Sequence, residues 1–339
     1  MPSTSKKVFV VGGAGYIGSH CVRELWKLGK DAYTIVVVDN LSTGHKESIP
    51  EGVLFEKADI RDKTSLMRVF KNHHPVDAVF HFCASIVVPE SCTDPFSYYQ
   101  NNVMGTLNML EVMNEFQVKK FIFSSTAAVY GMPSKSPIEE DDVKDPVNPY
   151  GETKLAVERI LKWCDAAYGI KSIILRYFNA CGADESGLIG EDREVETHLI
   201  PIVLQVPLNK RQNVSIFGKD YPTPDGTCLR DYIHVTDLAN AHIAALEYLC
   251  KHNVSNQFNL GCGIGYSVLE IIEAARLVTK HPIPAVMNDR RLGDPPSLIA
   301  SSAKAESVLN WKRKYTDIHE IVASAWKFHS NFPNGFKKI

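Results

Sequence analysis

The sequence has no excess of one charge, no closely paired cysteines and no long apolar run. Its 37 basic and 39 acidic residues leave a formal net charge of −2, so no basic stripe offers itself to nucleic acid. The eight cysteines include no Cys-x-x-Cys pair, which argues against a metal site and favours a reducing, cytoplasmic setting. No apolar stretch approaches the roughly 18–20 residues that cross a bilayer, so we expect a soluble protein without a membrane partner.

Short β-branched and aromatic runs alternate with helical patterns through the first half of the chain. This alternation predicts βαβ units and an α/β fold: a Rossmann-type, doubly wound parallel sheet covered on both faces. The predicted strands are 8–11, 35–38, 53–56, 79–82, 121–125 and 172–178.

The alternation of strand and helix patterns ends after Phe178. Polar and turn-rich segments follow and predict a smaller mixed α/β lobe that binds substrate. One more strand within 257–263, and a helix over 267–278 opened by a capping box, suggest that the chain crosses between lobes more than once. The predicted nucleotide domain spans 1–180, with 236–263 returning to it. The smaller lobe takes 181–235 and 264–339.

The run "VFVVGGAGYIG" spaces Gly12, Gly15 and Gly18 directly after a strand and at the opening of a helix. Such glycines let the backbone approach a pyrophosphate, whose charge then lies at the helix N-terminus. The next strand ends in Asp39-Asn40, where a carboxylate can bind the adenosine ribose and repel a 2′-phosphate. We therefore predict NAD rather than NADP; the alternative is a glycine turn without a ligand.

A second cluster, Gly261-x-Gly263-x-Gly265, has no acidic partner at a strand end. It precedes the capping box formed by Ser267 and Glu270. We interpret this cluster as a structural turn.

The segment "NPYGETK" holds Tyr150 and Lys154 four positions apart near the start of a helix that Asn148 can cap. Side chains at this spacing share one face of a helix, and an ammonium there lowers the pKa of a tyrosine towards that of a general base. A solvated helix face is the alternative. The hydroxyls of Ser124 and Thr126, at the end of a predicted strand, favour a proton-transfer site because ligands of open α/β folds bind at this edge.

These motifs, in this order with "FIFSSTAAVYG" and "LRYFNACGA", resemble the extended short-chain dehydrogenase/reductases. Within them the chain is most similar to the UDP-glucose 4-epimerases, through "IFGKDYPTPDGTCLRDYIHVTDLA" and "RRLGD" and along almost its whole length. The resemblance implies an NAD-dependent isomerase of galactose metabolism that interconverts UDP-galactose and UDP-glucose through a 4-keto intermediate, and a cytoplasmic homodimer formed by helices near 97–115 and 150–167.

The resemblance also implies residue roles. Tyr150 would exchange the proton of the sugar 4-hydroxyl, Lys154 would lower its pKa and bind the nicotinamide ribose, and Thr126 would bind the 4-oxygen. The cofactor-binding residues would be Gly12, Gly15, Tyr16, Ile17, Gly18, Asp39, Asn40, Asp59, Ile60, Phe82, Cys83, Ala84, Asn101, Ser124, Tyr150, Lys154, Tyr177 and Phe178. The substrate-binding residues would be Thr126, Asn179, His198, Leu199, Phe217, Arg230, Tyr232, Arg291 and Asp294, with the two arginines on the pyrophosphate.

The chain departs from the family pattern at three positions. Ile86 replaces a lysine of many members, and His198 an asparagine of some. Leu298 lies where the family decides whether an N-acetyl group fits, so UDP-GlcNAc and UDP-GalNAc stay open as substrates. A 4,6-dehydratase is less favoured because Ala127-Ala128 follow Thr126 and supply no acid. A non-catalytic NAD sensor is the remaining alternative.

Overall fold

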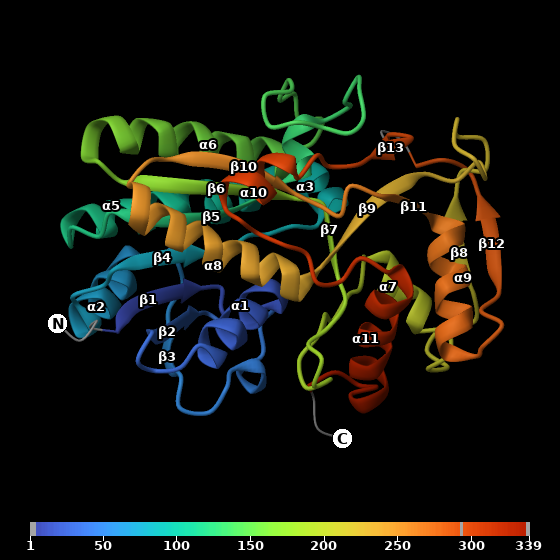
Figure 1. Cartoon of the computed structure of the whole chain (residues 1–339), viewed down its shortest axis with the longest axis horizontal. Coiled ribbons are helices and arrows are strands. Elements are labelled where there is room, and N and C mark those ends of the chain that lie inside the picture. Colours follow the sequence, from blue (N-terminus) through green and yellow to red (C-terminus); the bar gives the residue numbers. More distant parts are fainter. Residues whose placement is uncertain (1–4, 292–293, 337–339) are drawn as a thin grey trace.

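A parallel sheet of seven strands lies at the centre of the computed structural model, which describes residues 5–291 and 294–336 (Figure 1). The strand order is β10-β6-β5-β4-β1-β2-β3, and all neighbours run parallel. Winding therefore proceeds outwards from β1 in both directions, and the crevice where a doubly wound sheet binds ligands lies between β1 and β4. The strands are β1 (Lys6–Val11), β2 (Tyr33–Asp39), β3 (Leu54–Lys57), β4 (Ala78–His81), β5 (Lys120–Thr126), β6 (Lys171–Tyr177) and β10 (Asn256–Leu260).

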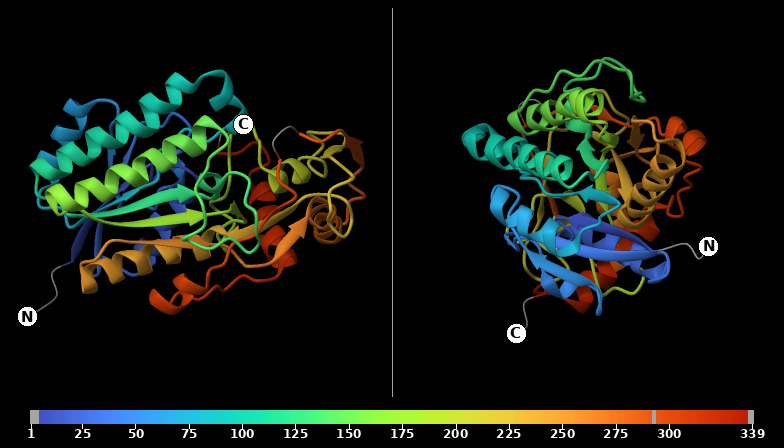
Figure 2. Two further views of the ribbon diagram at one scale, coloured as in Figure 1. Left: turned by 90° about the horizontal axis from the view of Figure 1, so that it is seen from above. Right: turned by 90° about the vertical axis from the view of Figure 1, so that its left-hand side faces the viewer.

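Helices cover both faces of this sheet (Figure 2). Alternate side chains of β1 show the division: Val8 and Val10 pack in the core under α1 and α8, whereas Phe9 and Val11 pack in the core under α2, α5 and α6. Burial on both faces explains why the strands are apolar throughout rather than alternating. No helix in the described ranges combines the length and apolarity needed to cross a membrane. The helices are α1 (Tyr16–Lys27), α2 (Lys63–His73), α5 (Gly105–Glu115), α6 (Pro149–Tyr168) and α8 (Val235–His252).

Within residues 179–291 and 294–336, the smaller lobe contains two short sheets and three helices around a separate apolar core that includes Ile200, Ile216 and Ile271. In one sheet β9 pairs with β7, β11 and β13; in the other β8 pairs with β12. Its elements are β7 (Asn179–Cys181), α7 (Leu199–Leu204), β8 (Val214–Phe217), β9 (Leu229–His234), β11 (Gly265–Ser267), α9 (Val268–Thr279), β12 (Ala285–Asn288), β13 (Ser297–Leu298) and α11 (Ile318–Asn331). The remaining short elements are η1 (Lys46–Ser48), α3 (Val88–Thr93), α4 (Pro95–Tyr98), η2 (Tyr99–Met104), η3 (Ala127–Tyr130) and α10 (Ala303–Val308).

The predicted Rossmann-type fold is confirmed, and the capping box of Ser267 and Glu270 opens α9 as expected. One stretch differs from the predicted division of the chain. Residues 303–311, assigned to the smaller lobe, pack instead on the large sheet: α10 contacts β10, and the Trp311 indole donates to the Asp237 carbonyl of α8 at 2.9 Å. The reason is apolar burial, because Trp311 joins the core under α1 and α8.

Candidate active site at the carboxyl edge of the sheet

The glycine loop joins β1 to α1 at the carboxyl edge of the sheet. Gly12 has φ of +79°, a conformation that favours glycine, and its amide donates to the Val38 carbonyl at 2.8 Å. A Cβ at Gly18 would lie 2.1 Å from the Gly12 carbonyl oxygen, so only glycine lets the first turn of α1 pack on the loop. Beside Gly15 the nearest such atom is 3.4 Å away, which leaves backbone open at the helix N-terminus.

Acidic groups at the ends of β2 and β3 lie beside this loop. The buried Asp39 carboxylate accepts from the amides of Ala14 at 3.0 Å and Leu41 at 2.8 Å, and burial raises the pKa of this carboxyl. The Asn40 amide donates to Asp59 at 2.9 Å, and the hydrogen bond from Arg61 is the main cause that lowers the Asp59 pKa. The two strand ends are therefore tied together, with a carboxylate next to the glycine loop.

The loop after β4, which carries Phe82, Cys83 and Ala84, approaches the glycine loop closely: a Cβ at Gly12 would lie 2.8 Å from the Cys83 nitrogen. Asn102 anchors the loop by accepting from the Ser85 amide at 2.8 Å and donating to Thr153 of α6 at 3.0 Å. The predicted Asn101 donates to the Ser85 hydroxyl at 3.2 Å. The buried Ile60 side chain packs against Gly105, where the lack of a Cβ leaves room for it.

Tyr150 and Lys154 lie in the first turns of α6. Asn148 caps this helix by accepting from the Gly151 amide at 2.9 Å, and Pro149 occupies its first position, as the sequence indicated. The Lys154 ammonium is buried and donates to the Ser124 carbonyl of β5 at 2.8 Å, above the Phe123 ring. Burial lowers the Lys154 pKa to about 8.

The Tyr150 pKa is raised, and burial of the hydroxyl is the largest cause. A hydrogen bond from Thr126 and the charge of Arg193 act in the opposite direction. The lowering role that the sequence interpretation gave to Lys154 stays a prediction. In the structure the Lys154 ammonium is directed to the Ser124 carbonyl.

Thr126, Ser124 and Tyr177 lie at the adjacent ends of β5 and β6. Thr126 pairs with Tyr177 in the strand register, and its hydroxyl accepts from the Ala128 amide at 3.1 Å. The Ser124 hydroxyl lies 2.9 Å from His242 Nε2. Burial raises the Tyr177 pKa, and the following Phe178 is buried. Hydroxyl and phenol groups from two neighbouring strands thus gather at one edge of the sheet.

Several predicted substrate residues line one small pocket in the smaller lobe, formed by β7, β9 and the start of α7. Asn179 and Tyr232 pair in the register of β7 and β9, and His198 and Leu199 lie at the start of α7. The pocket is lined by Asn179, Ala180, Cys181, His198, Leu199, Ile200, Pro201 and Tyr232.

Three charged residues near this pocket were not predicted from the sequence: Glu191, Arg193 and Glu196. The buried Glu191 carboxylate lies 2.8 Å from His198 Nδ1 and 2.9 Å from Arg193 Nη2, and burial raises the pKa of neighbouring Glu196 to about 7. Glu191, Glu196 and His198 are close enough to share a cation, but the Arg193 guanidinium already neutralises Glu191. The charged run "GEDREVETH" was the only available signal, and its spacing matches no site pattern.

The other predicted substrate residues form two pairs. Arg230 Nη2 lies 2.9 Å from the Asp294 carboxylate, and its Nη1 donates to the Pro295 carbonyl at 2.9 Å. The Arg291 guanidinium stacks 4.0 Å from the centre of the Phe217 ring. Each pair joins residues more than 60 positions apart, so the predicted groups are brought together by folding.

A sequence model of the NAD dependent epimerase/dehydratase family matches residues 8–261. The chain belongs to this family. It is 52% identical over 329 residues to the UDP-glucose 4-epimerase of Lacticaseibacillus casei, covering 97% of this chain and 98% of that one.

Comparison with solved structures also finds UDP-glucose 4-epimerases. The UDP-glucose 4-epimerase from Brucella ovis in complex with NAD is 43% identical with a TM-score of 0.91, covering 96% of this chain and 98% of that chain. The enzyme from Bifidobacterium longum, in complex with NAD+ and UDP, is 40% identical with a TM-score of 0.91, covering 98% and 100%. The predictions of an NAD-dependent UDP-glucose 4-epimerase and of NAD as its cofactor are confirmed by these findings.

The carboxyl edge of the seven-stranded sheet in this protein fits NAD. The glycine loop leaves space beside Gly15 at the α1 N-terminus, where a pyrophosphate carries its charge. The Asp39 carboxylate at the end of β2 suits a ribose hydroxyl and opposes a 2′-phosphate. A bound nicotinamide nucleotide would therefore extend from the glycine loop towards the ends of β4 and β5.

The second glycine cluster is a structural turn, as interpreted from the sequence. Its backbone amides are taken by a protein carboxylate: buried Asp231 accepts from Cys262 at 2.6 Å and from Gly263 at 3.0 Å. A Cβ at Gly261 would lie 2.4 Å from the same carboxylate. No donors at these positions are left for a phosphate.

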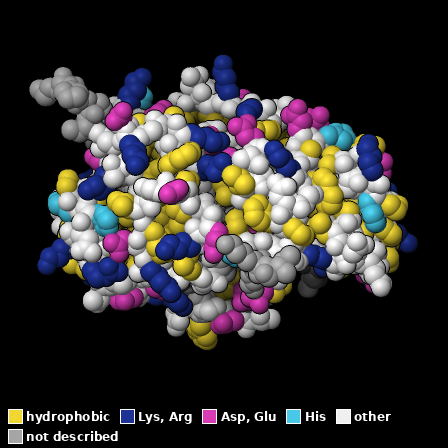
Figure 3. Space-filling view, turned by 90° about the horizontal axis from the view of Figure 1, so that it is seen from below, with side chains coloured by type: hydrophobic (Ala, Val, Ile, Leu, Met, Phe, Trp, Pro, Cys, Tyr) yellow, Lys and Arg dark blue, Asp and Glu magenta, His cyan; other side chains and the backbone are white. Residues whose placement is uncertain are grey.

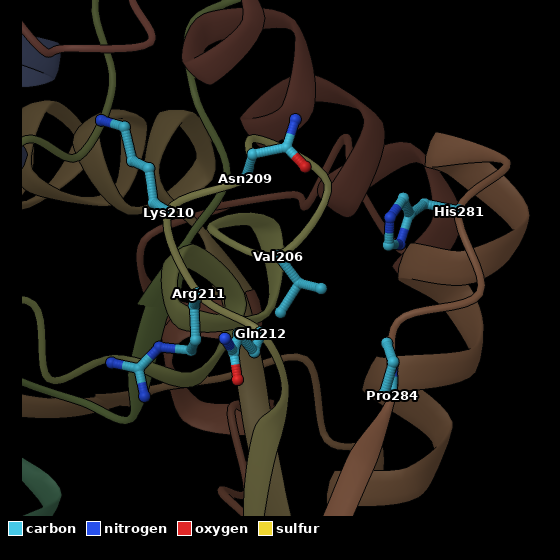
Figure 4. A pocket seen from close by; sticks show the side chains of 7 residues that line it. All are labelled: Val206, Asn209, Lys210, Arg211, Gln212, His281 and Pro284. Carbon is cyan, nitrogen blue, oxygen red and sulfur yellow. The ribbon is translucent and has the colours of Figure 1, made fainter.

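The smaller lobe also has a surface cavity of about 360 Å³ (Figure 4). The two basic side chains that line this cavity already have hydrogen-bond partners within the protein. Lys210 donates to the Pro333 carbonyl, and Arg211 donates to Gln205 at 3.3 Å. None of the predicted site residues lines it. The lining residues are Val206, Asn209, Lys210, Arg211, Gln212, His281 and Pro284.

Proposed function

We propose that the protein interconverts UDP-galactose and UDP-glucose with Tyr150 as the group that moves the proton of the sugar 4-hydroxyl. The observation that carries this assignment is the meeting of Tyr150, Thr126 and buried Lys154 where β5 and α6 converge. Bound NAD would supply the acceptor and donor for the hydride of the sugar C4.

The protein's own groups do the proton chemistry. The Tyr150 phenolate takes the 4-hydroxyl proton and gives it back to the 4-keto sugar once its other face is presented. Thr126 acts to lower the Tyr150 pKa and so favours the deprotonated base. Lys154 binds the nicotinamide ribose and keeps β5 and α6 in register through the Ser124 carbonyl.

We propose that the UDP-sugar is held mainly by the smaller lobe. Arg230 and Arg291 suit its pyrophosphate because guanidinium donors match phosphate oxygens and are always charged. Asn179, His198, Leu199 and Tyr232 line the pocket described above. Residues 1–180 with 236–263 would hold NAD, with the groups predicted for that site.

The test is Tyr150→Phe, which removes the exchangeable proton and little volume. Turnover of UDP-galactose to UDP-glucose, measured by separating the two sugar nucleotides, should fall by about 100- to 10,000-fold, while NAD stays bound. Tyr168→Phe is the matched control, because Tyr168 is an exposed tyrosine on the same helix. A Tyr150→Phe enzyme with near-normal turnover would contradict the assignment of the base.

We also propose a homodimer in a reducing, cytoplasmic compartment. Large apolar side chains are exposed on the helices expected at the two-fold axis, with Phe96 on α4 80% exposed and Trp163 on α6 71% exposed. All eight cysteines are free thiols, three of them not fully buried. Figure 3 shows the molecule from below, where apolar side chains lie among charged ones.

A further inference from the structure

A buried ion pair lies directly behind the proton-transfer site. Glu158 of α6 accepts from Arg176 of β6 through Nε at 3.0 Å and Nη2 at 2.7 Å, and both side chains are about 5% exposed. A buried ion pair contributes little net stability compared with apolar packing, because both charges lose their hydration. Stability alone is therefore a weak explanation for this pair.

The position of Glu158 connects it to the site residues. It lies one turn after Lys154 on the same helix, and its Oε1 accepts from the Ser125 hydroxyl at 2.5 Å. Ser125 stands between Ser124, whose carbonyl accepts from Lys154, and Thr126. One carboxylate thus binds the strand end that supplies both the partner of the lysine and the hydroxyl beside Tyr150.

Arg176 extends the network to the turn after Thr126. Its Nη1 donates to the Tyr130 hydroxyl at 2.8 Å, and Tyr130 donates in turn to Asn259 of β10 at 2.6 Å. Tyr130 ends the short helix η3 that begins directly after Thr126. The ends of β5, β6 and β10 and the start of α6 are therefore held in one set of hydrogen bonds.

The charges around Lys154 favour a second role for Glu158. Acting to raise the Lys154 pKa are Cys83, after β4, and Glu158 on its own helix, against the larger lowering effect of burial. His81 of β4 also faces the ammonium, and burial keeps its pKa low, to about 3, so it is neutral. Glu158 itself is faced by Arg176, Tyr130 and Lys144. Glu158 is the carboxylic acid among the groups that act to raise the Lys154 pKa.

We propose that Glu158, fixed by Arg176, is a positioning residue for the proton-transfer site: it holds the end of β5 against α6 and supplies the negative charge that keeps Lys154 an ammonium. This inference rests on the proposed function. Glu158 does not contact the sugar in this arrangement; it acts through Lys154, Ser125 and Thr126.

The experiment measures kcat and KM for UDP-galactose between pH 6 and pH 10 in the NAD-loaded enzyme and in Glu158→Gln. Loss of the carboxylate should shift the alkaline limb of the kcat-against-pH profile to lower pH by about one unit, because Lys154 then loses its proton at lower pH. KM should stay within about twofold. Glu158→Asp keeps the charge and should restore the parent's profile.

A Glu158→Gln enzyme whose pH profile superimposes on that of the parent would overturn the inference, even if its rate were lower. If the unpaired guanidinium prevents folding, the double variant Glu158→Gln/Arg176→Gln leaves no charge unpaired. It should show a smaller shift in the same direction, because the Arg176 cation that opposes Glu158 is removed as well. If that variant also fails to fold, Ser125→Ala decides: kcat should fall at constant KM, and an unchanged kcat refutes the positioning role. A parent enzyme that forms no UDP-glucose would instead refute the proposed function.

Discussion

Lys154→Met should change how the stability of the protein depends on pH. In the fold the Lys154 pKa is lowered by burial to about 8, from 10.5 in the unfolded chain. Between these two values the unfolded chain binds more protons than the folded one, so the lysine makes the parent protein more stable as pH rises. Methionine fills a similar volume without a charge and has no such dependence.

The size of the effect follows from the two pKa values. From pH 7 to pH 9.5 the parent should gain about 2 kcal/mol of unfolding free energy relative to Lys154→Met. For a chain of 339 residues this corresponds to a change of about 3 °C in the difference between the two melting temperatures. The variant also loses the hydrogen bond to Ser124. The part of that loss that depends on pH is already contained in the Lys154 pKa, and the rest cancels in the comparison.

Thermal unfolding of the cofactor-free proteins, followed by circular dichroism at several pH values, measures this difference. Lys162→Met is the matched control, because Lys162 lies on the exposed side of the same helix and its curve should run parallel to that of the parent. Curves for Lys154→Met and the parent that stay parallel from pH 7 to pH 9.5 would refute a buried lysine with a lowered pKa. The variant should also lose turnover.

Two further predictions concern the binding of cofactor and substrate. Gly18→Ala should release NAD, measured as cofactor per chain after purification, because its Cβ would lie 2.1 Å from the Gly12 carbonyl. Gly29→Ala is the control: its Cβ meets no atom, so it should cost some stability through its φ of +90° but keep NAD. Equal NAD in both variants would contradict the loop's role. Arg230→Lys should raise KM for UDP-galactose about tenfold with little change in kcat, because lysine loses the bidentate geometry; an unchanged KM would remove Arg230 from the substrate site.

Local sequence was sufficient to predict the elements that carry the site. The glycine spacing before α1, the carboxylate ending β2 and the Asn148-Pro149 helix start depend on backbone chemistry within a few residues. The predicted strands agree with the observed ones to within about two residues, because burial on both faces makes each an apolar run. The roles assigned to individual residues did not follow from local sequence alone; they came from the family resemblance.

Tertiary structure alone decided which groups meet and what charge they carry. The Lys154 ammonium points to the Ser124 carbonyl, and the groups that lower the Tyr150 pKa are Thr126 and Arg193, both distant in sequence. The pairing of Glu158 with Arg176 is likewise invisible in local patterns. Burial and hydrogen bonding set these properties, and both depend on atoms that the chain brings together only when β5, β6 and α6 are packed.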